Sequence, residues 1–483
     1  MLIKNPPACA LFWIRCSVCL GGNRRKLQAT PTLTGWRHYG VAREAEVERQ
    51  SQSLKTTLIA LFRLAANRGT HGLSRNVFLR FGAASWYILI SMSAHATDEQ
   101  FLHRALDVAR QGIGLASPNP YVGAVLVDAH GNVVGTGTYS YDGMKHAEVQ
   151  AIEHAGLKAR GATLYLNLEP CSHQGRTPPC ADAVIAAGIY RVVASMQDPN
   201  PKVSGSGFEK LRAAGVHVEV GRLEDQARRL NEAFARYIRH GVPLATLKAA
   251  LTLDGKIAPP PADALPADGT LPSSGFSGTW ITSESTRAHV QELRHQHDAI
   301  LVGIGTVLAD NPLLTDRSSH PRRRPLLRVI LDSRLRLPLD SRLVHSVRLG
   351  EGHHDVLVFC SSADERKKAE LEARGIRVEQ MPPDHYGRPE ILAILRRLGE
   401  LEITSVLIEG GASVNRTALA DRVADKIFFY YAPKILGGTG SIPLAAGAGF
   451  GSVSEAAQVK HIQLHRFGED FSVEGYLRDP YGA

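Results

Sequence analysis

The feature that most constrains this chain is a His-x-Glu pair followed by two cysteines. His146 and Glu148 lie in GMKHAEVQ, and Cys171 and Cys180 lie in LEPCSHQGRTPPC, one predicted strand further on. The whole chain has 483 residues but only 6 cysteines, so placing two of them here requires an explanation. Three interpretations are open: a structural zinc clip, a disulfide loop, or a zinc ion that activates water.

The number of available ligands favours the third interpretation. A structural zinc needs four protein ligands, whereas a catalytic zinc has three and keeps a position for water. Three are found here, namely His146, Cys171 and Cys180. Cys360 lies far along the chain, and His173, only two residues after Cys171, is expected to point elsewhere. We therefore expect one catalytic zinc per chain.

Two further properties of the motif agree with this expectation. Predicted helices open at His146 and at Cys180, where backbone N–H groups and the helix dipole stabilise a thiolate. Zinc lowers the pKa of bound water to about 7. Glu148 is close enough in sequence to carry the proton of that water as a general acid and base.

The charge of the chain is concentrated at one end. The net charge is +9, yet residues 1–92 alone hold 13 Lys and Arg against 3 Asp and Glu, which leaves the remainder at −1. The body therefore lacks the basic surface of a nucleic-acid-binding protein. Three cysteines in the body are too few for a secreted disulfide framework, and they indicate a reducing, cytoplasmic location.

Residues 1–92 are predicted to be a leader without a fold of its own. They contain short apolar runs, scattered Arg and no sustained periodicity, and no run approaches the length of about 18 residues that a membrane span needs. CSVC has the spacing of a metal or redox pair, but no second pair accompanies it. An Arg-rich leader is also typical of a transit peptide, although AREAEVER is acidic for one. We favour a natural start at Met92.

Strands and helices alternate after residue 97, which predicts an α/β protein with a largely buried sheet. The first predicted domain covers residues 93–240. Its expected helices are 98–112, 146–156, the segment from Cys180, and a single amphipathic helix at 223–241. Its expected strands are 121–128, 161–170, which should deliver Cys171 at its end, and 190–201, with a helix and strand at 208–221.

A second α/β domain is predicted over residues 241–483. A Pro-, Ala- and Ser-rich stretch without periodicity interrupts it at 259–278. The apolar segments expected to be strands are 243–258, 298–310, 326–333, 355–360, 403–411 and 425–438. Several end in Gly or Asp, and ligands gather at such strand ends in open α/β sheets.

These motifs resemble a known enzyme family. His-x-Glu followed by Pro-Cys and a second Cys is similar to the cytidine-deaminase-like superfamily, in which zinc activates water and the Glu moves protons. The spacer SHQGRTPP, the upstream ASPNPYVGAVLVD and the downstream DPNPKVSGSGFEKLRAAG resemble the deaminase half of the bifunctional riboflavin-biosynthesis family RibD. LKAALTLDGKIA, WITSESTRAHVQELRHQHDAILVGIGTVLAD and LIEGGASVNRTALADRVADKIFFYYAPKILGG resemble its reductase half. The resemblance covers about residues 95–480.

The resemblance implies that the first domain removes the 2-amino group of 2,5-diamino-6-(5-phosphoribosylamino)pyrimidin-4-one. By this analogy Glu148 is the acid and base at the zinc. The residues that match positions holding the pyrimidine and its phosphate are Asn119, His173 and Arg176. Many relatives carry a second His seven residues before the zinc His, whereas this chain has Tyr139 there.

For the second domain the resemblance implies a dihydrofolate-reductase-like fold that reduces the ribosyl chain to ribityl with NADPH. The residues matched to cofactor positions are Ala250, Trp280, Thr306, Asp310, Ser333, Gly411, Ala412, Ser413, Val414 and Asn415. Those matched to substrate positions are Arg294, Leu314, Arg317 and Glu409. A serine often found two residues before the Trp is not assigned, because that position is Gly278.

The expected partners are small phosphoribosyl-pyrimidines, without nucleic acid or membrane, and a homo-oligomer is left open. A nucleic-acid base deaminase with an appended domain would need a basic groove and stacking aromatic residues, which the near-neutral body and 6% aromatic content disfavour. A binding module that keeps zinc only for folding would have no use for Glu148. The sequence therefore predicts a bifunctional zinc deaminase and NADPH reductase.

Overall fold

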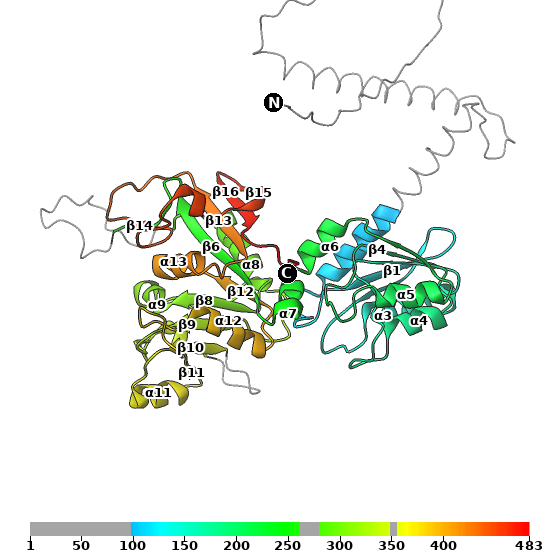
Figure 1. Cartoon of the computed structure of the whole chain (residues 1–483), viewed down its shortest axis with the longest axis horizontal. Helices are drawn as coiled ribbons and strands as arrows, with labels where there is room; N and C mark the ends of the chain where they lie inside the picture. Colours follow the sequence, from blue (N-terminus) through cyan, green and yellow to red (C-terminus); the bar gives the residue numbers. More distant parts are fainter. Residues whose placement is uncertain (1–97, 261–279, 348–354, 483) are drawn as a thin grey trace, which may run out of the picture. The chain divides into compact units, whose positions relative to one another are not determined.

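The computed structural model describes residues 98–260, 280–347 and 355–482. These residues form two large β-sheets with helices packed on them, one before and one after residue 240 (Figure 1). The proposed leader, with CSVC and Met92, lies outside the described residues, as does most of the Pro-rich insert. Within the described ranges no helix combines the length and apolar character needed to cross a membrane.

The first sheet has five strands in the order β2-β1-β3-β4-β5. Strand β1 pairs antiparallel with β2 and β3, and β3, β4 and β5 run parallel. The strands are β1 Gly123–Val127, β2 Val133–Thr138, β3 Thr163–Leu166, β4 Arg191–Ala194 and β5 His217–Val220. All but β2 and β5 are almost fully buried, which agrees with the continuous apolar segments expected from the sequence.

Helices cover both faces of this sheet. On one face lie α3 Ala147–Ala155, α4 Cys180–Ala186 and α5 Ser206–Ala213, which pack on the side chains of Ala124, Leu126 and neighbouring strands. On the other face the helix at 98–110 and α6 Glu224–Leu230 pack on Val125 and on side chains around Leu168. Successive side chains of β1 thus point to opposite faces of the sheet and pack into two separate hydrophobic cores.

Two glycines bring α3 directly against β2. A Cβ atom at Gly135 would lie 2.1 Å from the carbonyl oxygen of Ala151, and one at Gly137 would lie 2.1 Å from that of Ala147. Only glycine permits this approach, and the facing helix residues are alanines. Because His146 caps α3 and Glu148 lies in its first turn, this contact fixes the height of both residues over the sheet.

The segment 223–241 differs from its prediction as one helix. It forms α6 and α7 Glu232–His240, and Asn231 breaks the helix between them. Asn231 is fully buried, accepts from the backbone N–H of Tyr121 at 2.8 Å and donates to its carbonyl at 3.1 Å. The Asn231 side chain hydrogen-bonds both backbone groups of Tyr121, and these bonds hold Asn231 in a conformation that does not continue the helix. The break therefore arises from a tertiary contact.

The second sheet has nine strands in the order β11-β10-β9-β8-β12-β6-β13-β16-β15. It is parallel from β11 to β13 and antiparallel from there to β15. The strands are β6 Leu244–Thr252, β8 Ala299–Gly303, β9 Leu327–Leu331, β10 Val356–Cys360, β11 Arg377–Gln380, β12 Ser405–Ile408, β13 Lys426–Ala432, β15 Lys460–Phe467 and β16 Asp470–Tyr476. Strands β7 Lys256–Ala258 and β14 Ile442–Pro443 form a separate pair.

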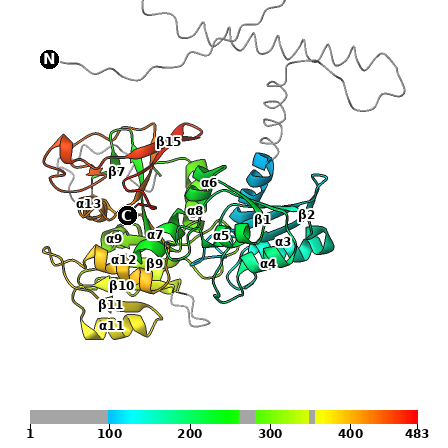
Figure 2. The ribbon, with the colours of Figure 1, turned by 45° about the vertical axis from the view of Figure 1, so that its right-hand side comes forward.

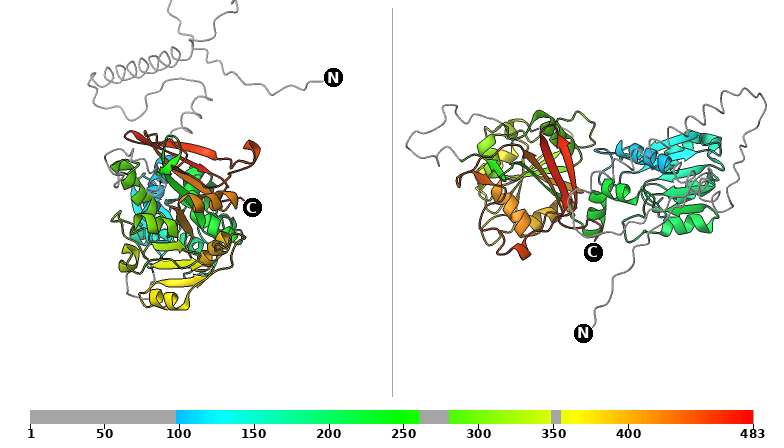
Figure 3. Two further views of the ribbon diagram at one scale, coloured as in Figure 1. Left: turned by 90° about the vertical axis from the view of Figure 1, so that its left-hand side faces the viewer. Right: turned by 90° about the horizontal axis from the view of Figure 1, so that it is seen from above.

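Helices also pack on both faces of this sheet. One face carries α12 Ile391–Glu400 and α13 Ala412–Ala420, and the other carries α8 Glu284–His295, α9 Ile304–Asp310, α10 Arg342–His345 and α11 Glu365–Glu372. Helix α11 lies beside β11 at one edge (Figure 2), and β15 and β16 form the opposite edge (Figure 3). The segment 298–310, expected as one strand, is β8 followed directly by α9.

The contact between α3 and β2 generates a prediction. We expect Gly137→Ala to destabilise the protein by about 1–3 kcal/mol, the usual cost of overpacking, because the new methyl group would overlap the carbonyl of Ala147. We also expect weaker zinc binding, since the helix start that carries His146 must shift. Urea unfolding and metal content after dialysis measure the two effects.

Gly451→Ala is the matched control for this prediction. A Cβ atom there meets only the flexible Glu455 carboxylate, at 3.4 Å. Unchanged stability and metal content in Gly137→Ala would contradict the role given to the contact.

Candidate active sites

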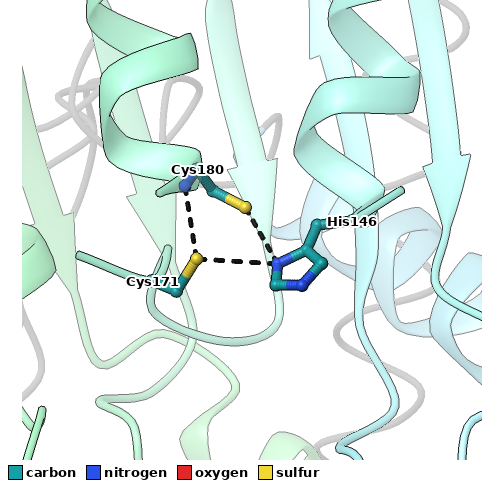
Figure 4. Close-up of side chains that lie close together, drawn as sticks. All are labelled: His146, Cys171 and Cys180. Carbon is teal, nitrogen blue, oxygen red and sulfur yellow. Dashed lines mark hydrogen bonds between the residues drawn. The ribbon is translucent and has the colours of Figure 1, made fainter. Parts of the chain in front are cut away.

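The three predicted ligands in the first domain lie together. The ligand atoms of His146, Cys171 and Cys180 are all within 4.8 Å of one another, and their side chains point to a common centre (Figure 4). Nδ1 of His146 is 2.9 Å from Sγ of Cys180 and 3.6 Å from Sγ of Cys171. His146 caps α3 and Cys180 opens α4, as predicted. Cys171 follows β3 by five residues instead of ending it.

Both cysteines are free thiols, which removes the disulfide interpretation. Cys171 accepts a hydrogen bond from the backbone N–H of Cys180, at 3.2 Å. A hydrogen bond with the Cys180 side chain and the nearby His146 lower the pKa of the Cys171 thiol, whereas the same contact and burial raise the pKa of Cys180. The pair therefore favours a thiolate at Cys171, the form that binds a metal ion.

Glu148 lies beside this cluster as a buried carboxylate. The residue is only 3% exposed, and among the described residues its Oε2 has no hydrogen-bond partner. Burial raises the pKa of Glu148 to about 7, because a charge in an apolar surrounding is unfavourable. A cation held by the three ligands would supply the missing counter-charge, and an orphaned oxygen facing it could exchange a proton.

The donor set fits zinc with one open position. One imidazole and two thiolates are ligands that zinc prefers, and a closed structural site would need a fourth. Over the described ranges no other His, Cys, Asp or Glu joins the cluster, and His173 is exposed. The geometry therefore agrees with the catalytic interpretation.

A pocket of about 280 Å³ opens beside the cluster. Asn119, His173 and Arg176, the predicted substrate residues, all line it together with His146 and Glu148. Arg176 contacts the carbonyl of Tyr141 at 3.3 Å and lies 4.1 Å over its ring, which holds the cation at the pocket rim. Tyr139, noted in the sequence at this side of the site, also lines the pocket, whereas sequence reasoning did not select Met144, Asp198, Asn200, Phe234 and Ile238.

Glu169, which the sequence analysis did not select, organises the loop that carries Cys171. Its carboxylate is buried and accepts backbone N–H groups of Asp198, Gly205 and Gly207 at 3.0, 2.9 and 2.8 Å. These bonds tie the loop after β3 to the start of α5. The available signal was an acidic residue at the end of an apolar strand, directly before Pro-Cys.

In the second domain the structure brings Arg294 and Glu409 together. Arg294 donates to Glu409 at 2.7 and 3.1 Å, and Lys248 donates to the same carboxylate at 3.3 Å. The three side chains are only 11–12% exposed. Although burial opposes it, the nearby Arg294 and Lys248 hold the pKa of Glu409 at about 2.

Sequence reasoning did not select Lys248, and the two arginines matched to substrate positions, Arg294 and Arg317, differ in their surroundings. Arg294 is already neutralised by Glu409, whereas the exposed side chain of Arg317 makes no ion pair within the described part of the chain. The signal for Lys248 was a single lysine inside the apolar segment LATLKAALT of β6. A lysine there requires a buried partner.

Leu314 lies in the core below these charges. Its side chain is 5% exposed and packs with the cluster around β8 and β9, and its φ is 56°. A contact between Leu314 and a ligand would therefore involve mainly the backbone.

Most of the predicted cofactor residues lie near the carboxyl ends of four adjacent parallel strands, β9, β8, β12 and β6. Ser333 follows β9, Thr306 and Asp310 belong to α9 directly after β8, residues 411–415 follow β12, and Ala250 lies inside β6 near its end. Oγ1 of Thr306 is 3.5 Å from the position of a Cβ atom on Gly411, the residue that caps α13. Ligands bind at such an edge, where helix N-termini meet.

The side chains of Asn415, Trp280 and Asp332 each have a defined contact near this edge. Asn415 is fully buried and donates to the carbonyl of Leu444 at 2.8 Å, so its side chain holds that loop. Trp280 is 66% exposed, with the guanidinium of Arg287 5.1 Å from its ring centre. Asp332 accepts from the N–H of Leu337 at 2.8 Å, so it caps the turn that presents Ser333.

Two family models match the chain. The cytidine and deoxycytidylate deaminase zinc-binding region matches residues 95–196, and the RibD C-terminal domain matches residues 243–473. The first match contains the ligand cluster and Glu148, and the second contains the charged triad and the strand edge. The order of the two folds confirms the predicted class, a cytidine-deaminase-like domain followed by a dihydrofolate-reductase-like domain.

Whole proteins match with the same arrangement. The riboflavin biosynthesis protein RibD of Bacillus amyloliquefaciens is 41% identical over 383 residues, which cover 79% of this chain and 97% of that protein. Acinetobacter baumannii RibD has a similar structure, with a TM-score of 0.66, 32% identity and coverage of 79% and 99%.

A third protein, from Thermotoga maritima, is described as a diaminohydroxyphosphoribosylaminopyrimidine deaminase and 5-amino-6-(5-phosphoribosylamino)uracil reductase. It has a TM-score of 0.65 and 37% identity, and the similarity covers 79% of this chain and 99% of that protein. Because sequence and structure agree across both domains and nearly the full length of these proteins, the chain belongs to the RibD family of riboflavin biosynthesis proteins.

Proposed function

We propose that this chain catalyses two consecutive steps of riboflavin biosynthesis. The first hydrolyses the 2-amino group of 2,5-diamino-6-(5-phosphoribosylamino)pyrimidin-4-one, which gives the corresponding uracil and ammonia. The second reduces its ribosyl chain with NADPH to 5-amino-6-(5-phosphoribitylamino)uracil. The observation that carries the proposal is a buried carboxylate with one unpaired oxygen, Oε2 of Glu148, beside a three-ligand cluster, in a chain whose second domain belongs to the same family.

In the first step His146, Cys171 and Cys180 hold the zinc. Bound zinc supplies an activated water at the carbon that carries the amino group. Glu148 accepts a proton at Oε2 and returns it to the departing nitrogen, so that ammonia leaves and a carbonyl forms. Its pKa of about 7 without a metal suits this exchange, and a nearby cation would lower it.

The pocket residues orient the substrate for this step. Asn119 offers an amide to the pyrimidine edge, and His173 and Arg176 offer donors to the phosphate. Phe234 and Ile238 of α7 form the apolar part of the lining, which suits a flat ring. The lining thus offers polar groups for the phosphate and the ring edge, and apolar side chains for the ring faces.

In the second step NADPH supplies the hydride, and the edge formed by β9, β8, β12 and β6 holds it. We assign Ala250, Trp280, Thr306, Asp310, Ser333 and the segment 411–415 to this cofactor. Arg294, Leu314, Arg317 and Glu409 contact or position the substrate, with Arg317 as the free cation. Lys248 joins them, because its ammonium is held against Glu409 at the same edge.

We further propose that the enzyme works in the cytoplasm on small phosphoribosyl-pyrimidines, without nucleic acid or membrane as partner. The near-neutral charge outside residues 1–92 and the free thiols of the described cysteines support this proposal. Domain limits of 93–240 and 241–483 fit the two separate sheets. Size-exclusion chromatography with light scattering would determine whether it forms a homo-oligomer.

The two activities should be separable by one substitution. Glu148→Gln is expected to lower the deamination rate at least 100-fold, the usual effect of removing a general acid and base. It should keep about one zinc per chain, and it should still reduce supplied 5-amino-6-(5-phosphoribosylamino)uracil. Mass spectrometry of the products and metal analysis measure these results.

Glu153→Gln is the matched control for Glu148→Gln. Glu153 lies on the same helix, but it is exposed and pairs with Lys145 at 2.8 Å. Deamination by Glu148→Gln at the wild-type rate would contradict the assignment of the acid and base. Two zinc ions per chain would instead point to a second metal site in CSVC.

The buried triad predicts a pH-dependent stability. Glu409→Gln leaves two buried cations without their carboxylate, so we expect a loss of about 3–5 kcal/mol at pH 7. The folded pKa of Glu409 is about 2, below the unfolded value of about 4.3, so the wild type loses this stability as the pH falls from about 4 to about 2.

Urea unfolding at pH 7 and at pH 3 tests this expectation. The difference between Glu409→Gln and wild type should be smaller at pH 3. Glu372→Gln, an exposed substitution on α11, serves as control. A constant or growing difference at low pH would show that the carboxylate is not ionised in the folded protein.

The reductase should prefer NADPH to NADH through a charge at the end of β9. Asp332 is occupied by its own turn, whereas Arg334 is exposed beside Ser333 and can meet a 2′-phosphate. A charge-assisted hydrogen bond contributes about 1.5–3 kcal/mol. Arg334→Ala should therefore raise KM for NADPH about 10- to 100-fold and leave KM for NADH nearly unchanged.

Steady-state kinetics with both cofactors tests this assignment. Arg366→Ala, a substitution of an exposed arginine on α11, is the control and should change neither value. Equal use of both cofactors by the wild type would refute the preference. An equal rise of both KM values in Arg334→Ala would show that Arg334 does not recognise the 2′-phosphate.

A further inference from the structure

Tyr139 stands in the pocket where many relatives have a histidine, and its position is tightly fixed. It follows β2 directly, its backbone N–H donates to the carbonyl of Val122 at 3.0 Å, and the residue is only 5% exposed. A Cβ atom on Gly112 would lie 2.9 Å from the Tyr139 carbonyl, so the turn after the helix at 98–110 packs closely against this backbone. The side chain is therefore a rigid part of the wall.

The hydroxyl of Tyr139 contacts the pocket residue Asn119. Nδ2 of Asn119 donates to the Tyr139 oxygen at 2.6 Å, a short hydrogen bond for this pair of groups. An amide whose NH₂ end is engaged in this way must turn its carbonyl oxygen elsewhere. Both residues line the pocket, and no described residue donates a hydrogen bond to Oδ1 of Asn119, so this oxygen remains an acceptor for a ligand.

The ring of Tyr139 also contacts the zinc-binding histidine. Its centre is 5.2 Å from that of the His146 ring, with an angle of 82° between the planes, an edge-to-face arrangement. This packing uses the ring and not the hydroxyl. The two functions of Tyr139, support of His146 and orientation of Asn119, can therefore be separated by removing the oxygen alone.

We propose that Tyr139 is a positioning residue that sets the specificity of the deaminase pocket through Asn119. By holding the NH₂ end of the Asn119 amide, it presents Oδ1 as an acceptor for an N–H group of an aminopyrimidinone. Without the hydroxyl the amide can rotate and present a donor, which would repel the N–H edge. This inference rests on the proposed deaminase function and adds a specificity residue to it.

The decisive variant is Tyr139→Phe, which keeps the ring beside His146. We expect about one zinc per chain, unchanged reduction of supplied 5-amino-6-(5-phosphoribosylamino)uracil, and a kcat/KM for deamination about 10- to 100-fold lower. Most of the change should fall on KM, because the acid and base at the zinc are unaffected. Tyr190→Phe is the control, since it removes a hydroxyl from an exposed tyrosine of the same domain and leaves the Asn119 contact intact.

A double-mutant cycle distinguishes positioning from a general structural effect. If Tyr139 acts through Asn119, adding Tyr139→Phe to Asn119→Ala should change kcat/KM by less than about 3-fold. Additive losses, a wild-type kcat/KM in Tyr139→Phe, or loss of zinc from this variant would each overturn the proposal. Additivity would show a direct or independent role, and zinc loss would show a role through His146.

A binding measurement tests the role of Tyr139 without requiring catalytic turnover. Calorimetry with 2-aminopyrimidin-4-one on zinc-loaded protein should show weaker binding to Tyr139→Phe than to wild type, by about the same 10- to 100-fold. A wild type that binds this compound without deaminating the phosphoribosyl substrate would refute the proposed function and not the role of Tyr139. Equal affinity of wild type and Tyr139→Phe would refute the role of Tyr139 and not the proposed function.

Discussion

A buried carboxylate needs a counter-charge, and much of this structure follows from how two glutamates meet that need. Glu148 is buried with one oxygen unpaired, and burial without a counter-charge raises its pKa. Glu409 is also largely enclosed, but Arg294 and Lys248 keep its pKa far below the usual value. The first carboxylate is suited to exchange a proton beside a metal ion, whereas the second stays ionised and orients cations.

The positions of both glutamates depend on close backbone packing. Gly135 and Gly137 let α3 lie directly on β2, which sets the height of His146 and Glu148, and Glu169 ties the Cys171 loop to α5. In the second sheet, β8 and β12 run side by side into Gly303 and Gly410, where a Cβ atom would meet Val414 at 2.9 and 2.5 Å. Small residues in these strands thus allow the first turns of helices to pack closely against the sheet, and each site lies where such a helix begins.

The sequence predicted the site better than its surroundings, for a physical reason. His and Cys are common zinc ligands, so His146, Cys171 and Cys180 could be recognised in the sequence. The alternating apolar segments predicted both sheets. The helix break at Asn231 was not visible, because it depends on the backbone of Tyr121, 110 positions away. Lys248 was missed because its partner Glu409 lies on another strand, 161 positions on. Tertiary partners outweigh local propensity at these residues.

Tyr139 lies beside the metal ligands, but it is placed by a different element from theirs. His146 and Cys180 are placed by the starts of α3 and α4, and Cys171 by the loop after β3, while Tyr139 directly follows β2. Its ring meets the ring of His146 edge to face, a contact that does not use the hydroxyl. Loss of the hydroxyl can therefore alter the partner of Asn119, and with it the hydrogen-bonding pattern shown to the substrate, while the ring stays beside His146. The fold therefore allows recognition to vary while the metal chemistry stays constant.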